Sequence, residues 1–344
     1  MSRNPDFAKI IRDVFALDPK WVDWFVDEVY TDEQLRFAEI DGKMASVLLA
    51  TPYTMEFHGK EVRCEYLSCV ATVPNQRGKG LMHHLMHDTL AGLAERGVPF
   101  AALIPASRPL YFIYDRMGFA TVFYVDEERY TALHKFEKGD YKRVEPDYEM
   151  FYLLESQRRG SVRHDETQFS QILEDLRLSN GIVAAVDNGN GSYAVAFAEV
   201  KDEIKILDIL STDQAAADAA LSEIRDEGGE KGFVVSAVPT DDCVALRSHG
   251  MLRICNVEAA LNALAETNPK ISMTIRIKDR FLPENNGVYV VKAGRCERKS
   301  DGERQKLDLD VSVSVLAEIL FSTTKIGDLF NLPTRRPFIS LMLD

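Results

Sequence analysis

Apolar and polar residues alternate along the first part of the chain in two different periods. Residues 5–30 place apolar side chains three to four positions apart, with a break near Pro19, which predicts two short helices. Three apolar runs follow, separated by the glycine-centred turns "DGK" and "HGK", and this arrangement predicts antiparallel hairpins. The predicted strands cover residues 35–40, 44–57 and 62–73.

The pattern then changes to alternating helix and strand. Residues 80–96 carry an apolar stripe at helical spacing and end at Gly97, a common helix terminator. A buried strand over 99–106, a second helix over 108–117 and a strand over 119–125 complete the unit. Strands that alternate with helices indicate an α/β (α+β) fold with a mixed sheet, here over residues 1–133.

Part of this order recurs after a charged connector at 131–150. A helix, two strands around "NGNG", a third strand, a helix and a further strand predict a second unit over residues 134–250. Its helix at 213–226 opens with alanine-rich, acidic sequence and has no basic glycine loop before it. A third unit, over 251–344, combines helices at 257–267 and 315–322 with three strands. Its apolar ending "PFISLMLD" predicts a terminus that docks against the protein.

Composition restricts the possible partners. The chain of 344 residues is 46% hydrophobic and carries a net charge of −13, which excludes a general nucleic-acid binder and suits a cationic substrate. Charged residues interrupt the N-terminal segment, so we expect neither a signal peptide nor a membrane span. We therefore expect a cytoplasmic protein. Five scattered cysteines show no zinc or disulfide spacing: Cys64, Cys69, Cys243, Cys255 and Cys296.

A short basic loop separates the third predicted strand from the helix that follows it. Arg77, Gly78, Lys79 and Gly80 stand directly before Leu81, and helix N-termini offer free N–H groups to phosphates. The spacing matches neither the P-loop nor the Rossmann glycine motif. The loop therefore predicts a pyrophosphate site, with a solvated charged turn as the alternative.

The same loop resembles the R/Q-x-x-G-x-G/A signature of the GNAT acetyltransferases, with Met82 in place of the last small residue. The strand "SCVATV" is similar to the central strand of that family, and "IYDRMGF" resembles its FY-x-x-x-GF segment. The resemblance implies acetyl-CoA as co-substrate and Tyr114 as general acid to the departing thiolate. It further implies cofactor contacts by the loop, the central strand and the start of the next helix: Val70, Ala71, Thr72, Arg77, Gly78, Lys79, Gly80, Leu81 and Ser107.

Met82 and the three-unit plan resemble one group of this family, the Eis-like (enhanced intracellular survival) proteins. That group joins a GNAT domain, a second GNAT-like domain without a cofactor loop, and a C-terminal sterol-carrier-protein-like domain. The resemblance implies that the terminal carboxylate, on Asp344, acts as general base, and that the chain forms a homo-oligomer, a hexamer. It implies direct acetyl transfer in a ternary complex to a primary amine of an aminoglycoside- or polyamine-like molecule or to lysine.

Several alternatives stay open at this point. Glu65 is a second candidate for the base, Tyr114 could serve only for packing, and Ser107 could cap the helix that follows it. His83 and His87 share a helix face, but no clear third ligand accompanies them, so no metal is expected. The competing function is a non-catalytic scaffold that binds acyl-CoA or lipid. A longer acyl group is a further possibility.

Overall fold

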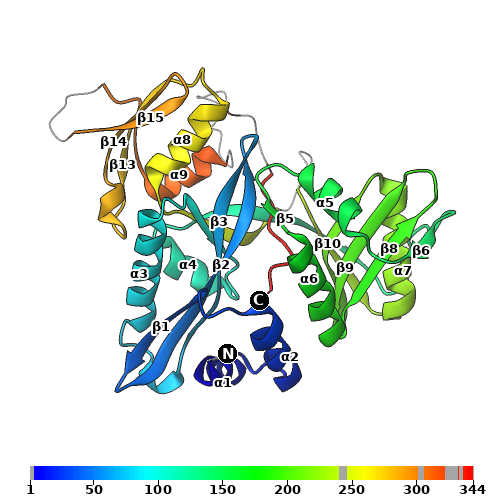
Figure 1. The fold of residues 1–344 in the computed structure, drawn as a ribbon. Helices are drawn as coiled ribbons and strands as arrows, with labels where there is room; N and C mark the ends of the chain where they lie inside the picture. Colours follow the sequence, from blue (N-terminus) through cyan, green and yellow to red (C-terminus); the bar gives the residue numbers. More distant parts are fainter. Residues whose placement is uncertain (1–3, 240–245, 301–305, 322–331, 333–335, 344) are drawn as a thin grey trace.

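A twelve-stranded mixed sheet runs through two of the three units (Figure 1). The computed structural model describes residues 4–239, 246–300, 306–321, 332 and 336–343. The strand order is β1-β2-β3-β4-β12-β5-β11-β10-β9-β8-β6, and β7 pairs with β2. A mixed α/β architecture, as the sequence predicts, is confirmed.

The first unit begins with helices packed beside an antiparallel meander. Asn4 and Asp18 cap α1 and α2, and a π-helical turn at Phe25–Val29 continues α2. The predicted strands and helices of this unit are all present, within a few residues of the expected bounds. They are α1 (Pro5–Phe15), α2 (Pro19–Trp24), β1 (Leu35–Ile40), β2 (Lys43–Phe57), β3 (Lys60–Thr72), α3 (Leu81–Glu95), β4 (Phe100–Leu103), α4 (Arg108–Asp115) and β5 (Ala120–Tyr130).

A strand from much later in the chain completes the sheet of the first unit. Strand β12 (Leu246–Ile254) lies between β4 and β5 and is antiparallel to both. The sequence pattern does not predict this strand, because its first half, "LRSHG", is polar and only its second half is buried. The predicted unit boundary at residue 250 therefore falls inside one strand, and the units share a continuous sheet.

The second unit repeats the order of the first. Its meander leads through a helix into a strand parallel to the last meander strand, as β3, α3 and β4 do in the first unit. Helix α5 lies partly in the segment that the pattern predicts as a connector. The elements are β6 (Lys142–Val144), α5 (Tyr148–Ser156), β7 (Val162–Arg163), α6 (Glu166–Leu178), β8 (Ile182–Asp187), β9 (Tyr193–Val200), β10 (Glu203–Ser211), α7 (Gln214–Gly228) and β11 (Gly232–Ala237).

A four-stranded sheet, in the order β15-β14-β13-β16, forms the C-terminal unit together with two apolar helices. Its core is continuous with that of β2, β3 and β12, so it packs firmly on the first unit. The elements are α8 (Val257–Thr267), β13 (Met273–Lys278), β14 (Gly287–Lys292), β15 (Arg295–Lys299), β16 (Leu309–Ser312) and α9 (Val313–Leu320). No helix of the described residues is long and apolar enough to cross a lipid bilayer.

The last part of the chain returns to the boundary between the first two units. Residues Phe338–Leu343 are buried, and Figure 1 shows this red segment descending between the strands of the first unit and α6. The apolar ending thus packs against the rest of the protein, and its docking in an active site stays a prediction. Asp344 lies outside the described residues.

Candidate active site

Strands β3 and β4 begin side by side and then separate. β4 pairs with β3 only at Cys64, Glu65 and Tyr66, whereas the pairing of β3 with β2 continues to Thr72. Beyond Tyr66, the edge of β3 that faces away from β2 therefore has no ladder partner within the described part of the chain. An open strand edge offers N–H and C=O groups to an extended ligand. Val70, Ala71 and Thr72, predicted as cofactor contacts, lie on this segment.

A β-bulge interrupts β3 where the separation begins. Val47 pairs with Ala71 and Leu49 with Ser68, so Cys69 and Val70 together face Leu48. Cys69 has a positive φ of 51°, which is uncommon for a residue other than glycine. A bulge leaves one residue unpaired and re-aims its peptide groups. The bulge therefore changes the direction of the peptide groups of β3 at the point where this strand leaves β4.

The basic loop leads from β3 into the exposed N-terminus of α3. Gly78 and Gly80 have φ values of 78° and 76°, and a Cβ added to Gly78 would meet no atom within 4 Å. Gly80 is the N-cap, and no side chain caps the helix, so the first N–H groups of α3 remain available. The Nε of Arg77 donates to the carbonyl of Thr72 at 3.1 Å, and Nζ of Lys79 donates to Gln76 at 2.6 Å. Open space, free donors and positive charge fit a pyrophosphate.

Tyr114 lies under the open strand segment in the core of the first unit. Its ring is 5% exposed, packs against Phe119 at 5.7 Å and shares a cluster with Leu67, with Val70 and Met82 packed at the margin. Its hydroxyl makes no hydrogen bond within the described part of the chain. Burial raises the pKa of Tyr114 to about 12, so the side chain keeps its proton at neutral pH.

The two residues with alternative interpretations differ in their surroundings. Ser107 stands at the N-cap position of α4, is exposed and makes no side-chain capping hydrogen bond. Glu65 is 2% exposed, and its carboxylate accepts from the guanidinium of Arg63 at 2.7 and 2.5 Å. An ion-paired carboxylate of this kind is held by its partner, which favours a structural role for Glu65.

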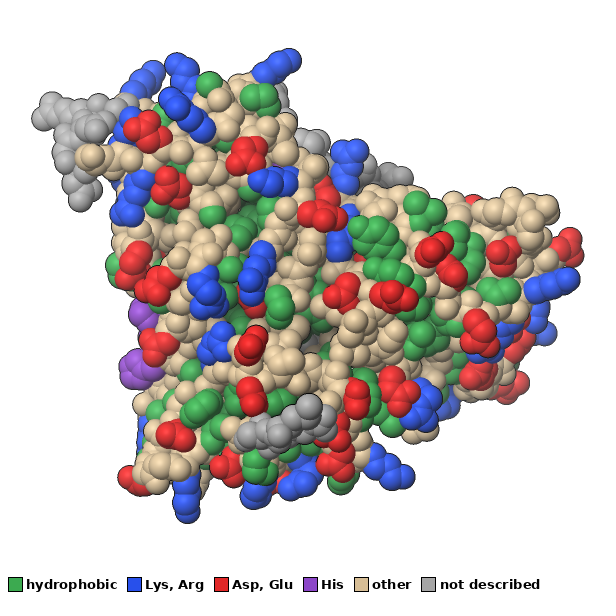
Figure 2. Space-filling view, in the orientation of Figure 1, with side chains coloured by type: hydrophobic (Ala, Val, Ile, Leu, Met, Phe, Trp, Pro, Cys, Tyr) green, Lys and Arg blue, Asp and Glu red, His purple; other side chains and the backbone are tan. Residues whose placement is uncertain are grey.

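A cleft lies between the first two units, beside β3 and the docked C-terminal segment. Its inner pocket, of about 320 Å³, contains Leu343 together with Tyr66 and Ser68 of β3. Glu28 and Asp165 are the charged side chains among its described lining residues, which include no lysine or arginine. Figure 2 shows acidic side chains on both sides of the boundary between these units.

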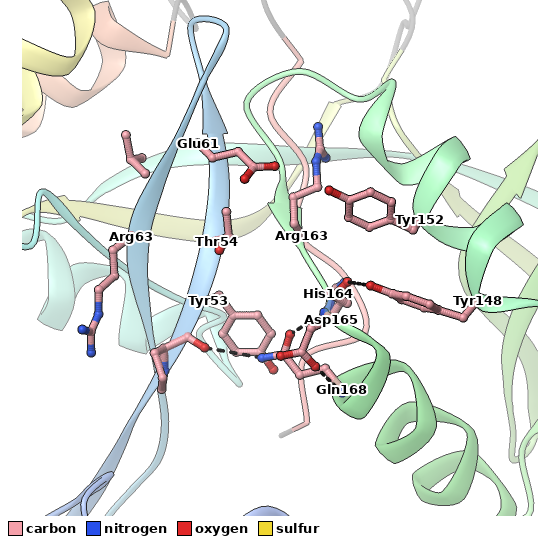
Figure 3. Close-up of a pocket in the computed structure, with 12 residues that line it drawn as sticks. Tyr53, Thr54, Glu61, Arg63, Tyr148, Tyr152, Arg163, His164, Asp165 and Gln168 are labelled. Carbon is pink, nitrogen blue, oxygen red and sulfur yellow. Dashed lines mark hydrogen bonds between the residues drawn. The ribbon is translucent and has the colours of Figure 1, made fainter.

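An outer pocket of about 750 Å³ continues the cleft, because both pockets share Pro52, Tyr53, Asp165 and Gln168. Figure 3 shows tyrosines from β2 and α5 on either side of it, while Arg63 points away from the cleft. Gln168 crosses the cleft and donates to the carbonyl of Pro52 at 3.4 Å. The pocket lies between segments that are far apart in the sequence, and no local motif reveals its lining.

The histidines of α3 lie at the surface, at the left edge of Figure 2. The rings of His83 and His87 both contact the ring of Phe281, and their centroids lie 5.0 and 5.6 Å, respectively, from the centroid of Phe281. Among the described residues no group of three or more His, Cys, Asp or Glu side chains could hold a metal ion.

The second unit has a carboxylate where the first has its glycine loop. Asp213 caps α7 and accepts from the N–H of Ala216 at 2.9 Å. Hydrogen bonds, above all from Ser192 and then from that N–H, lower the pKa of Asp213 to about 2. A negative charge already occupies the N-terminus of α7, which disfavours the binding of an anion at this position.

Two family models match separate parts of the chain. Residues 2–122 match the family model of the acetyltransferase (GNAT) domain. The chain carries a GNAT acetyltransferase domain. Residues 257–332 match the sterol carrier protein domain, which is the third unit. The predicted enzyme class is thereby confirmed at the level of the domain, and a GNAT domain implies the use of an acyl-CoA.

Solved structures share the whole arrangement at low sequence identity. A GCN5-related N-acetyltransferase from Anabaena variabilis is 16% identical with a TM-score of 0.75, covering 98% of this chain and 97% of that one. Eis1 from Mycobacterium abscessus is 17% identical with a TM-score of 0.72, covering 95% and 89%. A probable N-acyltransferase from Enterococcus faecalis is 16% identical with a TM-score of 0.75, covering 98% and 96%. These likenesses establish the three-unit fold. No curated protein matches the sequence.

Proposed function

We propose that the protein is an acetyl-CoA-dependent N-acetyltransferase that acts on a primary amine by direct transfer in a ternary complex. The observation that carries the proposal is that two binding surfaces, one for the cofactor and one for the acceptor, meet at the bulge of β3. The open strand edge and the α3 loop reach it from one side, and the acidic cleft with the C-terminal segment reaches it from the other. Such a meeting point allows two substrates to be held in contact.

Acetyl-CoA supplies the acyl group as a thioester. Arg77, Lys79 and the N-terminus of α3 suit its pyrophosphate, while the edge of β3 from Val70 to Thr72 suits its pantetheine arm. Backbone N–H groups on the open edge of β3 would stabilise the negative charge that develops on the thioester oxygen. Tyr114, protonated because burial raises its pKa, donates a proton to the leaving thiolate.

A protonated amine cannot attack, so a base must first remove its proton. We assign this role to the terminal carboxylate on Asp344. Support comes from Leu343, the preceding residue, which lies in the inner pocket beside Ser68. Glu65 remains the second candidate, but its contact with Arg63 makes it the weaker one.

The acceptor that suits the cleft is cationic. Glu28 and Asp165 are exposed carboxylates of the inner pocket, and Tyr53 links it to the outer pocket with further tyrosines. Carboxylates and aromatic faces both attract ammonium groups. An aminoglycoside- or polyamine-like molecule, or an exposed lysine, fits this chemistry. A cytoplasmic location and a hexamer remain predictions.

The test is the release of CoA thiol from acetyl-CoA in the presence of polyamines, aminoglycosides and lysine-containing peptides. The proposal predicts release that depends on the amine and that Glu28→Gln together with Asp165→Asn weakens through a higher KM for the amine. Binding of acetyl-CoA without release to any amine would instead favour the non-catalytic scaffold. If CoA thiol is released faster from a longer acyl-CoA than from acetyl-CoA, the transferred group is a longer acyl group and not acetyl.

A further inference from the structure

The second unit contains the same strand separation as the first, at the equivalent strand. Strand β10 pairs with β11 only from Glu203 to Ile206, while its pairing with β9 continues to Ser211. The register shifts between Ile206 and Asp208, which places a bulge where the strands part. In the first unit this geometry leaves an open edge.

In the second unit an ion pair fills that edge. Asp208 is 1% exposed and accepts from both terminal nitrogens of Arg158, at 2.7 and 2.6 Å. The same guanidinium donates to the carbonyl of Ile209 at 2.9 Å, and the N–H of Ile209 donates to Asp208 at 2.7 Å. Both peptide groups of Ile209 are therefore occupied, so no pantetheine-like chain can pair with this strand there.

The ion pair in turn holds the C-terminal segment. The hydroxyl of Ser340 donates at 2.6 Å to Oδ2 of Asp208, which also accepts from Arg158. The Arg158 guanidinium lies 5.0 Å from the ring centre of Phe338. His249 of β12 contacts the carbonyl of Ile339 at 2.9 Å. The hydrogen bond from the Ser340 hydroxyl to this buried carboxylate is strong, because charge-assisted hydrogen bonds are stronger than neutral ones.

These contacts lie close to the proposed base along the chain. Each extended residue spans about 3.3–3.6 Å, so the few residues after Ser340 can reach only a short distance from it when Ser340 is fixed. Leu341 adopts a left-handed φ of 54°, and Leu343 then enters the inner pocket beside Ser68. The anchor on β10 therefore determines where the chain terminus can lie.

We propose that Arg158, Asp208 and Ser340, together the terminal clamp, are positioning residues for acetyl transfer. The second unit uses its strand separation to hold the segment that delivers the base, where the first unit uses the equivalent separation for its cofactor. This role rests on the proposed function, because it presumes that the terminal carboxylate is the base. None of the three residues contacts the reacting atoms.

The test compares Ser340→Ala with Ser222→Ala, which removes a buried hydroxyl from α7 of the second unit, a helix that contributes no residue to the clamp. Ser340→Thr keeps the hydroxyl and serves as the conservative variant. Hydrogen exchange of the C-terminal peptide is measured beside kcat and both KM values. Ser340→Ala should speed exchange by about tenfold or more, since a hydrogen bond to a charged group is lost. It should lower kcat about tenfold at unchanged KM for acetyl-CoA, and Ser340→Thr should restore both.

Unchanged exchange in Ser340→Ala would overturn the clamp. Faster exchange with an unchanged kcat would overturn its role in positioning the base. A wild-type protein without amine-dependent release would refute the proposed function and with it the positioning role, whereas the exchange experiment would still report on the clamp itself. The two failures are therefore distinguishable.

Discussion

Tyr114 combines two properties that a proton donor needs at the end of a thioester reaction. Its ring extends from α4 into the core that α3 and β3 share, and its hydroxyl has no partner within the described part of the chain. Burial raises its pKa to about 12, which keeps the hydroxyl protonated at neutral pH and able to hydrogen-bond to the sulfur as negative charge develops on it. Packing and catalysis are therefore compatible roles for one side chain.

Replacing Tyr114 by Phe separates these roles. We expect kcat to fall by about 100-fold, the lower end of the usual contribution of a general acid. The free energy of unfolding should change little, because the ring stays and no hydrogen bond is lost. Steady-state kinetics and urea denaturation check the two expectations. A kcat within about twofold of wild type would leave Tyr114 as a packing residue only.

The raised pKa of Tyr114 also has a consequence for stability. The unfolded chain ionises its tyrosines near pH 10, whereas folded Tyr114 ionises near 12. Above pH 10 the unfolded state therefore binds fewer protons than the folded state, and stability falls as the pH rises toward 12. Thermal unfolding of wild type and Tyr114→Phe between pH 8 and about 11 should show a smaller loss in the variant. Equal losses would contradict the assigned pKa.

At the scale of the elements, one strand and one helix create the cofactor side of the site. β3 leaves β4 after Tyr66, bulges at Cys69 and ends in a loop that opens α3 without a side-chain cap. The second unit keeps the strand separation but places Asp213 at the helix N-terminus. The same arrangement of elements therefore leaves the helix N-terminus open in one unit and caps it with a carboxylate in the other.

Two glycines at opposite ends of this arrangement allow a matched test. Gly78 and Gly97 flank α3, have φ values of 78° and 72°, and leave open space for a Cβ. Alanine at either position should cost about 1 kcal/mol, because left-handed backbone strains an L residue. Only Gly78→Ala should also raise the KM for acetyl-CoA, by about tenfold, since its methyl group enters the proposed phosphate site. Equal KM values for the two variants would place the cofactor elsewhere.

Local patterns predict these elements well and their distant partners poorly. The meander, α3 and the docking of the C-terminal segment follow from apolar periodicity and turn residues. Strand β12 escapes prediction because its apolar run is short and its neighbours, β4 and β5, lie far away in sequence. In the same way the loop and Tyr114 belong to local motifs, whereas Asp208 and Ser340 meet their partners only in the fold.

On the scale of the whole molecule, a buried ion pair joins the third unit to the large sheet. Arg253 of β12 and Asp279, after β13, are 0% and 1% exposed as side chains and contact each other. Asp279 also accepts from the N–H groups of Phe281 and Leu282, at 3.1 and 2.9 Å. The unit that bears the sterol carrier protein fold is thus tied to a strand of the GNAT sheet.

Removing the carboxylate of Asp279 should therefore destabilise the protein as a whole. Asp279→Ala leaves a buried guanidinium without its partner, and we expect a loss of about 3–5 kcal/mol in the free energy of unfolding. Asp310→Ala is the control, because its ion pair with Lys278 lies at the surface of the same small sheet. Urea denaturation measures both. Similar small changes in the two variants would show that the buried pair does not join the units.

The central claim is that the end of the chain supplies the base, and an extension after Asp344 tests it most directly. A short appended segment with a protease site would convert the terminal carboxylate into a peptide bond, and cleavage after Asp344 would restore it. We expect amine-dependent CoA release to fall by about 100-fold in the extended protein and to return on cleavage, with unchanged binding of acetyl-CoA. Release at the wild-type rate before cleavage would contradict the account and direct attention to Glu65.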